Sequence, residues 1–329
     1  MKSSKVVRIS QIRRMVYVGP ALVVLLFLAT APLLIDTAVV GLITKILCYG
    51  LLAMSADIAF GYTGLWTFGH AALFGVAAYS TAMFLRYTDL HSFWIITPIA
   101  LALTAVVAAI FAAIAARSSG LYFLLITFAM GQVIYSITMQ WRTVTRGNEG
   151  LWGVSFPDIG FRFNGTSYYY FTLVVVAICA LILYWFTKSP FGYSLEGIRE
   201  NEVRARTMGY NTGLRKVIAF VISGIFAGVA GILFVYYNGG LSPESIGMAA
   251  SGMAIIMVII GGTATLWGGV IGSAVVLAMQ YYISLYTPAR WPIFLGAIFI
   301  AAVFFAGGGI FPLLANLWKK VAFYGSLDS

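Results

Sequence analysis

Long apolar runs separated by short polar breaks make up most of this chain. Because a membrane-spanning helix needs about 20 consecutive apolar residues, the pattern predicts about ten spans in an all-α, polytopic membrane fold with broken, glycine-rich helices. The spans are expected near residues 16–35, 37–59, 65–85, 93–116, 120–139, 168–187, 215–237, 246–263, 268–286 and 291–316. The predicted domains are a basic N-terminal tail at 1–15, a transmembrane domain at 16–316 and a C-terminal tail at 317–329.

The composition supports a membrane protein and excludes a soluble globular domain. Of the 329 residues, 61% are hydrophobic and 9% are charged, whereas a soluble domain has about a quarter of its residues charged. The net charge of +10 comes from basic residues in short loops and tails, so nucleic acid is not an expected partner. Cys48 and Cys179 fall within spans and lack Cys or His neighbours, which predicts neither a disulfide nor a metal site.

The basic residues also predict which side of the membrane each loop occupies. With ten spans, the N-terminal cluster, Arg117, the segment 188–216 and the Lys319/Lys320 pair all lie on one side. The positive-inside rule assigns that side to the cytoplasm, so both termini are expected there. The first apolar run is long enough to span and is interpreted as an uncleaved helix.

A polar segment interrupts the apolar pattern between the second and third spans. It contributes the candidate translocation-pathway residues Asp57, Gly61, Gly64, Thr67, Gly69 and His70. Broken helices expose backbone groups, which a membrane tolerates only against protein or a watery cavity. Asp57 is the only acidic residue within a predicted span, where an unpaired carboxylate costs about 3 kcal/mol. A functional role and a helix-capping role are both open for Asp57, whereas His70 is expected to be a satisfied hydrogen-bonding residue.

A second glycine-rich segment echoes the first. Residues 61–69 and 261–269 both combine glycine with threonine and tryptophan, which adds Gly261 and Gly262 to the pathway candidates. The spans that follow are predicted to run in the same direction, so the echo indicates similar packing chemistry and not an inverted repeat.

Small residues four apart predict closely packed helices in lipid. They occur at Gly224 and Gly228, followed by Gly231, and again at Gly268 and Gly272. The spacing indicates packing and says little about a substrate.

The cytoplasmic loop at 188–215 predicts one short amphipathic helix that ends at Gly209. Its apolar residues recur at helical spacing, namely Leu195, Ile198, Ala205 and Met208. Two favourable i,i+4 ion pairs are expected, Glu200 with Arg204 and Glu202 with Arg206.

Several sequence blocks occur in the order found in one transport family. They are Gly61-Tyr-Thr-Gly64, Gly69-His70-Ala71, Gly120-Leu-Tyr-Phe123, Ser189-Pro-Phe-Gly192, Ile198-Arg-Glu-Asn-Glu202, Ser242-Pro-Glu-Ser245, Gly261-Gly-Thr and Leu266-Trp-Gly268. Together they resemble the permease subunits of branched-chain amino-acid ABC importers, and in particular the second of the two paired permeases. The resemblance implies a multi-pass protein of the bacterial inner membrane that supplies half of a translocation pathway and is not an enzyme.

The resemblance also implies a set of partners. They are a homologous second permease, two cytoplasmic ATPase subunits, an extracytoplasmic substrate-binding protein and membrane lipid. The loop at 188–215 would hold the coupling helix that enters a cleft of the ATPase, with a docking surface of Arg199, Glu200, Glu202, Arg204, Ala205 and Gly209. The chain has no GxxxxGKS or GxxxxGKT phosphate loop, so no cofactor is expected in it, and ATP and Mg would belong to the ATPase subunits.

Departures from the family's pattern leave the substrate open. The family typically has Asn at the position of Asp57, and Gln and Ser near Leu65 and Thr67. Asp57 with the Gly-Tyr-Thr-Gly-Leu motif is similar to the related urea and short-amide permeases. Branched-chain or other amino acids are expected, with urea, short amides or aromatic acids as alternatives. The alternative from a different class is a stand-alone ion-coupled secondary transporter that titrates Asp57.

Overall fold

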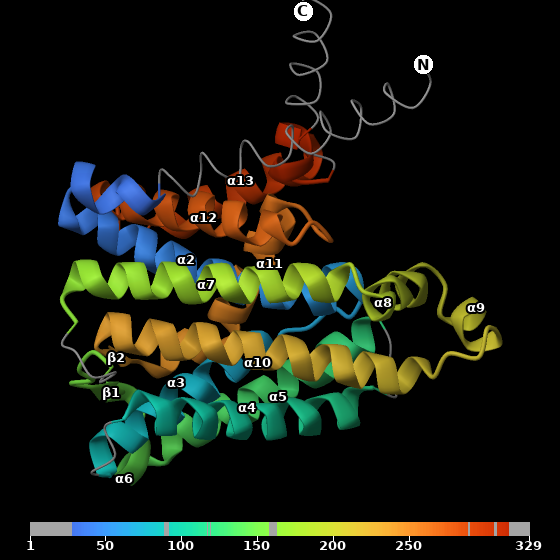
Figure 1. Ribbon diagram of the computed structural model, residues 1–329, viewed down its shortest axis with the longest axis horizontal. Coiled ribbons are helices and arrows are strands. Elements are labelled where there is room, and N and C mark those ends of the chain that lie inside the picture. The colour runs from blue at the N-terminus through green and yellow to red at the C-terminus, as the bar shows by residue number, and fades with distance from the viewer. Residues whose placement is uncertain are drawn as a thin grey trace, which may run out of the picture.

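The computed structural model describes residues 28–88, 92–116, 118, 120–157, 163–288, 290–305 and 308–315. In this part of the chain the protein is a helical bundle in which most helices run along the long axis (Figure 1). The predicted tails and most of the first predicted span lie outside the described residues. The all-α polytopic class is confirmed, and one pair of two-residue strands accompanies the helices.

Six helices in the described ranges are long and apolar enough to cross a membrane. They are α2 (Thr37–Asp57), which continues into the π-helical turn η1 (Ile58–Tyr62), α4 (Phe93–Ala115), α5 (Leu121–Gln140), α7 (Gly165–Thr187), α10 (Thr212–Asn238) and α12 (Trp267–Tyr286). Three further helices are shorter or more polar, namely α3 (His70–Tyr87), α11 (Met248–Gly261) and α13 (Trp291–Phe305). The predicted count of about ten spans is therefore not confirmed.

Breaks in the helices explain part of the difference, and the first predicted span lies mostly outside the described residues. The predicted span at 65–85 starts in an irregular segment, because α3 begins only at His70. Helix α11 has 14 residues and is therefore about 21 Å long, shorter than the roughly 30 Å of a bilayer's hydrocarbon core. Hydropathy averaged over a window runs across such breaks, since glycine and threonine are only weakly polar.

Helix α10 lies in the main core, where it packs against α2, α3 and α4. The predicted small-residue packing is confirmed there. A Cβ added at Gly224 would lie 2.7 Å from the Cβ of Ala108, and one at Gly231 would lie 2.1 Å from the carbonyl oxygen of Phe74. A second core joins α2, α11, α12 and α13, and glycine is again required because a Cβ at Gly272 would lie 1.8 Å from the carbonyl oxygen of Met257.

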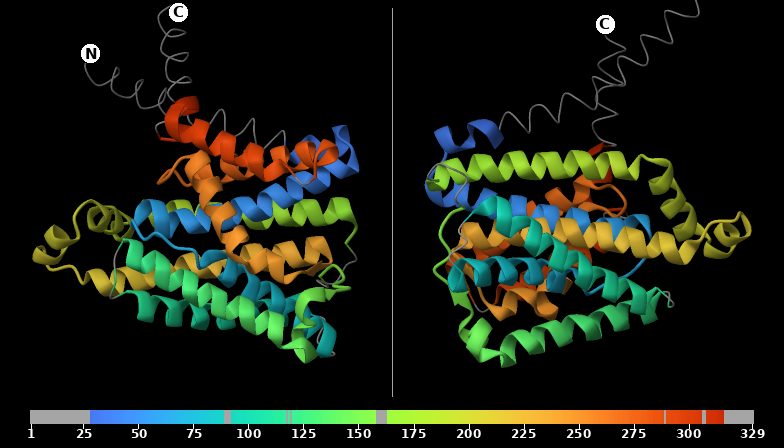
Figure 2. Two further views of the ribbon diagram at one scale, coloured as in Figure 1. Left: turned by 180° about the vertical axis from the view of Figure 1, so that it is seen from behind. Right: turned by 60° about the horizontal axis from the view of Figure 1, so that its bottom comes forward.

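The two ends of the bundle differ. At one end lie α6 (Arg142–Thr145), the 3₁₀ turns η2 (Gly147–Glu149) and η3 (Pro243–Ile246), and the antiparallel strands β1 (Leu151–Trp152) and β2 (Gly240–Leu241). At the other end α8 (Pro190–Glu200) and α9 (Glu202–Thr207) project beyond the bundle, as Figures 1 and 2 both show. The bundle thus presents a compact strand-bearing end and a projecting helical end.

Candidate functional site

The two glycine-rich segments meet inside the protein. The first follows η1, and the second is the turn between α11 and α12. Asp57 joins them, because its Oδ1 accepts a hydrogen bond from the backbone N–H of Ala264 (2.8 Å) and its Oδ2 accepts one from that of Leu266 (3.0 Å). Leu266 directly precedes α12, so the fully buried carboxylate lies at the positive end of that helix. Asp57 therefore bonds the turn that leads into α12, and does not cap the helix end at which it lies.

The second segment holds two residues in a strained backbone conformation. Ala264 has φ 56° and Leu266 has φ 54°, a left-handed region that costs a non-glycine residue about 1 kcal/mol. Both residues donate to Asp57, so these hydrogen bonds offset the strain. Gly61 makes the approach possible, since a Cβ there would lie 2.0 Å from Oδ1 of Asp57.

Arg199 of α8 reaches the first segment from the projecting end. Its Nη1 donates a hydrogen bond to the carbonyl oxygen of Gly61. Its aliphatic stem lies over Gly64, where an added Cβ would be 2.9 Å from Cγ of Arg199. A residue predicted for the ATPase-docking surface thus contacts the helix break within the chain.

The remaining pathway candidates are also buried inside the subunit. Thr67 Oγ1 accepts a hydrogen bond from the N–H of Gly69 (3.0 Å), and Nε2 of His70 lies 3.1 Å from Oγ of Ser223. The His70 ring packs edge-on against Phe220 at 5.5 Å between ring centres. These contacts lie at the start of α3. The expectation of a satisfied histidine is confirmed only for Nε2, because the buried Nδ1 of His70 has no hydrogen-bond partner in the described part of the chain.

The second break is built from close backbone contacts. A Cβ on Gly261 would lie 1.8 Å from the carbonyl oxygen of Gly268, and Gly262 has φ 121°. One cluster thus contains four of the predicted pathway residues, namely Asp57, Gly61, Gly261 and Gly262.

The polar loop at 188–215 contains two helices, where the sequence pattern predicts one. Asn201, with φ −159°, separates α8 from α9, and its Oδ1 accepts a hydrogen bond from the N–H of Arg204 (2.9 Å). Asparagine favours this N-cap conformation because its side chain satisfies a free backbone donor. The break lies between Glu200 and Arg204, and their predicted ion pair is not formed.

Glu202 anchors α9 to α10. The predicted pair with Arg206 is confirmed at 2.8 Å, and the second carboxylate oxygen lies 2.6 Å from Nζ of Lys216. Thr212 also donates to Glu202 at 3.1 Å. Partial burial raises the pKa of Glu202, but the hydrogen bonds from Lys216, Arg206 and Thr212 outweigh it, so the pKa lies below its ordinary value of 4.5.

Other residues at the end of α8, in α9 and just after it face solvent. The side chains of Glu200 and Arg204 are exposed, as are those of Val203 and Met208. The predicted apolar face is thus wrong for Met208, because α9 already ends at Thr207 and Met208 lies just beyond it. Leu195, Ile198 and Ala205 are buried as that face requires. Gly209, with φ 88°, ends this segment.

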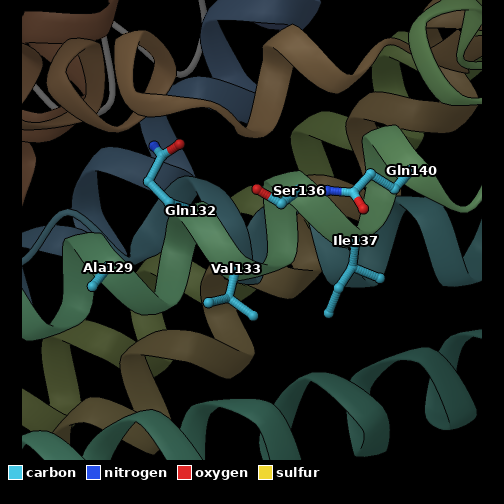
Figure 3. A pocket seen from close by; sticks show the side chains of 6 residues that line it. All are labelled: Ala129, Gln132, Val133, Ser136, Ile137 and Gln140. Atoms are coloured by element: carbon cyan, nitrogen blue, oxygen red, sulfur yellow. The ribbon is translucent and has the colours of Figure 1, made fainter.

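A line of polar side chains runs along α5. Gln132, Ser136 and Gln140 are four residues apart and share one face of the helix. With Ala129, Val133 and Ile137 they line an open hollow of about 290 Å³. Figure 3 shows the polar side chains along one side of α5 and the apolar ones along the other. Average hydropathy does not single out these polar residues, and their spacing of four is the signal that identifies them.

Comparison with known proteins places the chain among transport permeases. The profile of the family described as "Branched-chain amino acid transport system / permease component" matches residues 38–303. The high-affinity branched-chain amino acid transport system permease protein LivM of Escherichia coli (strain K12) is 28% identical over 267 residues, which cover 73% of this chain and 63% of that protein. LivM of Salmonella typhimurium (strain LT2) is 27% identical over 285 residues, or 79% of this chain and 67% of that protein.

A shorter match is to a permease named for a different substrate. The tyrosine transport system permease protein of Clostridioides difficile (strain R20291) is 30% identical over 130 residues, or 39% of this chain and 41% of that protein. The chain matches only 63% of the length of LivM from Escherichia coli. No solved structure matches the chain.

Proposed function

Because this chain belongs to the family of branched-chain amino acid transport permease components, we propose that it forms half of the translocation pathway of an ATP-driven importer. A homologous permease would supply the other half. The chain is then a transport subunit and not an enzyme, and ATP and Mg belong to partner ATPase subunits. The two LivM relatives support branched-chain amino acids as the substrate.

The polar face of α5 is the observation that carries this proposal. Gln132, Ser136 and Gln140 lie at the surface of an otherwise apolar spanning helix, where polar side chains facing lipid are unfavourable. They therefore require protein or water opposite them, which a pathway shared with a second permease provides. Amide and hydroxyl groups can hydrogen-bond the charged ends of an amino acid, and the apolar side of the same hollow suits a branched aliphatic side chain.

The projecting α8 and α9 support docking to an ATPase. Val203 is 72% exposed and Met208 is 69% exposed, and they stand beside the exposed charges of Glu200 and Arg204. An apolar patch rimmed by charge on a projecting helix suits insertion into a groove of another protein. The basic residues near this end support a cytoplasmic location in a bacterial inner membrane.

The opposite end supports contact with an extracytoplasmic binding protein. Trp141 and Trp152 are about half exposed there, and Arg86 holds the strand-bearing loop by donating to the carbonyl oxygen of Trp152 (3.1 Å). Exposed tryptophan is typical both of membrane interfaces and of protein contacts.

Reconstitution of the whole importer in liposomes tests the proposal. Labelled leucine should accumulate only when the second permease, the ATPases, ATP and the binding protein are all present. Ser136→Leu should lower uptake about tenfold, equivalent to about 1.4 kcal/mol for a lost hydrogen bond. Leu125→Met, on exposed α5 surface outside the hollow, is the matched control.

Two other outcomes would redirect the assignment. Uptake of tyrosine or urea in place of leucine would support the assignment as a permease and change the assigned substrate. Gradient-driven uptake by this chain alone, without ATP, would overturn the importer and favour the secondary transporter. The contacts of Asp57 oppose the latter, since both carboxylate oxygens accept backbone hydrogen bonds inside the subunit.

A further inference from the structure

We propose that Arg199 is a positioning residue that transmits movement of α8 to both helix breaks, through the carbonyl group of Gly61 and the carboxylate of Asp57. The inference rests on the proposed function for its meaning in transport. It assigns Arg199 a role inside the permease, in place of an ionic contact to the ATPase.

The first step is that the Gly61 carbonyl group needs an external donor. The backbone N–H groups after η1 bond to carbonyl groups at its start, since Thr63 N–H donates to Ile58 O (3.2 Å) and Leu65 N–H donates to Ala59 O (2.8 Å). The Gly61 carbonyl oxygen is thus one of the free acceptors at a helix C-terminus. The Arg199 guanidinium donates to it, and a cation is also favoured at this negative end of the helix dipole.

The second step is that α8 carries Arg199 as part of a firmly packed unit. Leu195 and Ile198 of α8 are buried. Arg215 of α10 donates to Oγ of Ser194 and stacks 5.2 Å from the ring centre of Phe191. Displacement of α8 therefore displaces the Arg199 side chain against η1.

The third step is that the first break is bonded to the second. Asp57 is the last residue of α2 and directly precedes η1. Its carboxylate holds the N–H groups of Ala264 and Leu266, both in a strained conformation. A shift of η1 that weakens these bonds would release strain at the start of α12. The contacts thus form a continuous connection from the projecting end to α12.

Gly64 leaves room for the Arg199 side chain to reach η1. With φ 73° it adopts a backbone conformation that favours glycine. The missing side chain leaves the space that the Arg199 stem occupies. Both features serve the approach of one arginine from a segment more than a hundred residues away.

The test uses the complete importer in liposomes and measures leucine uptake per ATP hydrolysed. Arg199→Met keeps an apolar stem over Gly64 and removes the donor, so this ratio should fall about tenfold while the ATPase still associates. Arg199→Lys, which can donate to Gly61, should restore most of the ratio. Lys188→Met removes an exposed charge from the same loop and should leave the ratio unchanged.

A double-mutant cycle with Asp57→Asn tests the link between the two residues. If they act through one connection, the effects on melting temperature and on the uptake ratio should be clearly non-additive. Additive effects, or a wild-type ratio for Arg199→Met, would overturn the inference. Loss of ATPase association in Arg199→Met would instead make Arg199 a docking contact.

The two proposals fail in different ways. Absence of ATP-driven leucine uptake by the wild-type importer would refute the proposed function. The melting-temperature cycle on the isolated chain would still measure coupling between Arg199 and Asp57. Wild-type uptake with an additive cycle would refute only the connection.

Discussion

At the scale of single residues, Glu202 shows how a carboxylate predicted for a partner surface is used inside the chain. Its two oxygens contact Arg206, Thr212 and Lys216. The Lys216 side chain is only 5% exposed, so removal of Glu202 would leave an ammonium group buried without an ionic partner. Loss of one partner of such a pair costs more than the pair itself contributes.

Glu202→Gln should therefore loosen α9. Because Glu202 is partly exposed, we expect a loss of about 2 kcal/mol in local stability, seen as faster amide hydrogen exchange across α9. Glu200→Gln, which changes an exposed carboxylate, is the control and should exchange like wild type. Equal exchange in all three proteins would contradict the anchoring role.

The same ion pairs predict a pH dependence. Since the pKa of Glu202 is lower in the folded chain than its ordinary 4.5, the pairs stabilise α9 fully above about pH 4.5 and lose this stabilisation as the pH falls through the folded pKa. Exchange in α9, corrected for intrinsic rates, should rise on acidification in wild type. Glu202→Gln should not show this acid-induced increase.

At the scale of elements, the helix breaks and the glycine contacts decide how the spans pack. Gly272 lets α12 approach the backbone of α11, whereas a Cβ added at Gly296 of α13 would meet open space. The same residue type thus serves close packing in one helix and has no such constraint in another. Only the tertiary contacts distinguish the two.

Gly272→Ala should destabilise the protein, because its Cβ would collide with a carbonyl oxygen. Overpacking of this kind costs about 1–3 kcal/mol, which a lower melting temperature in detergent would register. Gly296→Ala should be neutral or slightly stabilising, since alanine is the better helix former. A similar loss in both variants would argue against the close α11–α12 contact.

At the scale of the whole molecule, the two ends of the bundle present different chemistry. The projecting end exposes Val203 of α9 and Met208 just after it, and Glu202 bonds this segment to Lys216 of α10. The strand-bearing end lies at the far side of the bundle (Figure 1). The proposed importer, powered from one side and supplied from the other, would use this asymmetry.

Val203→Asp and Met208→Asp should weaken association with the ATPase subunits. Each places a charge in the proposed apolar contact, and we expect a loss of about 1–2 kcal/mol per substitution, measured as a higher Kd for the purified ATPase. Asn164→Asp adds the same charge at the opposite end, where Asn164 precedes α7, and should not change this Kd. Unaltered binding in the two α9 variants would move the docking site elsewhere.

Local pattern by itself determined the membrane class, the small-residue packing and the position of the polar loop at 188–215. These features depend on composition and short spacing, which are written in consecutive residues. The interrupted apolar pattern also made Asp57, Gly61 and Gly64 candidates, whereas Arg199 became a candidate through the family resemblance, as a contact to an ATPase. The break at Asn201 was missed because helical periodicity counts apolar positions and disregards the capping asparagine.

Tertiary structure alone decided which of these residues meet. Asp57 contacts Ala264 and Leu266 across more than two hundred residues, and Arg199 contacts Gly61 across more than one hundred. Hydrogen bonds between such distant segments depend on how the helices pack, and hydropathy carries no information on that. The polar face of α5 depends on both. The spacing of its polar residues is written in the local sequence, but their exposure depends on which side of the helix the bundle covers.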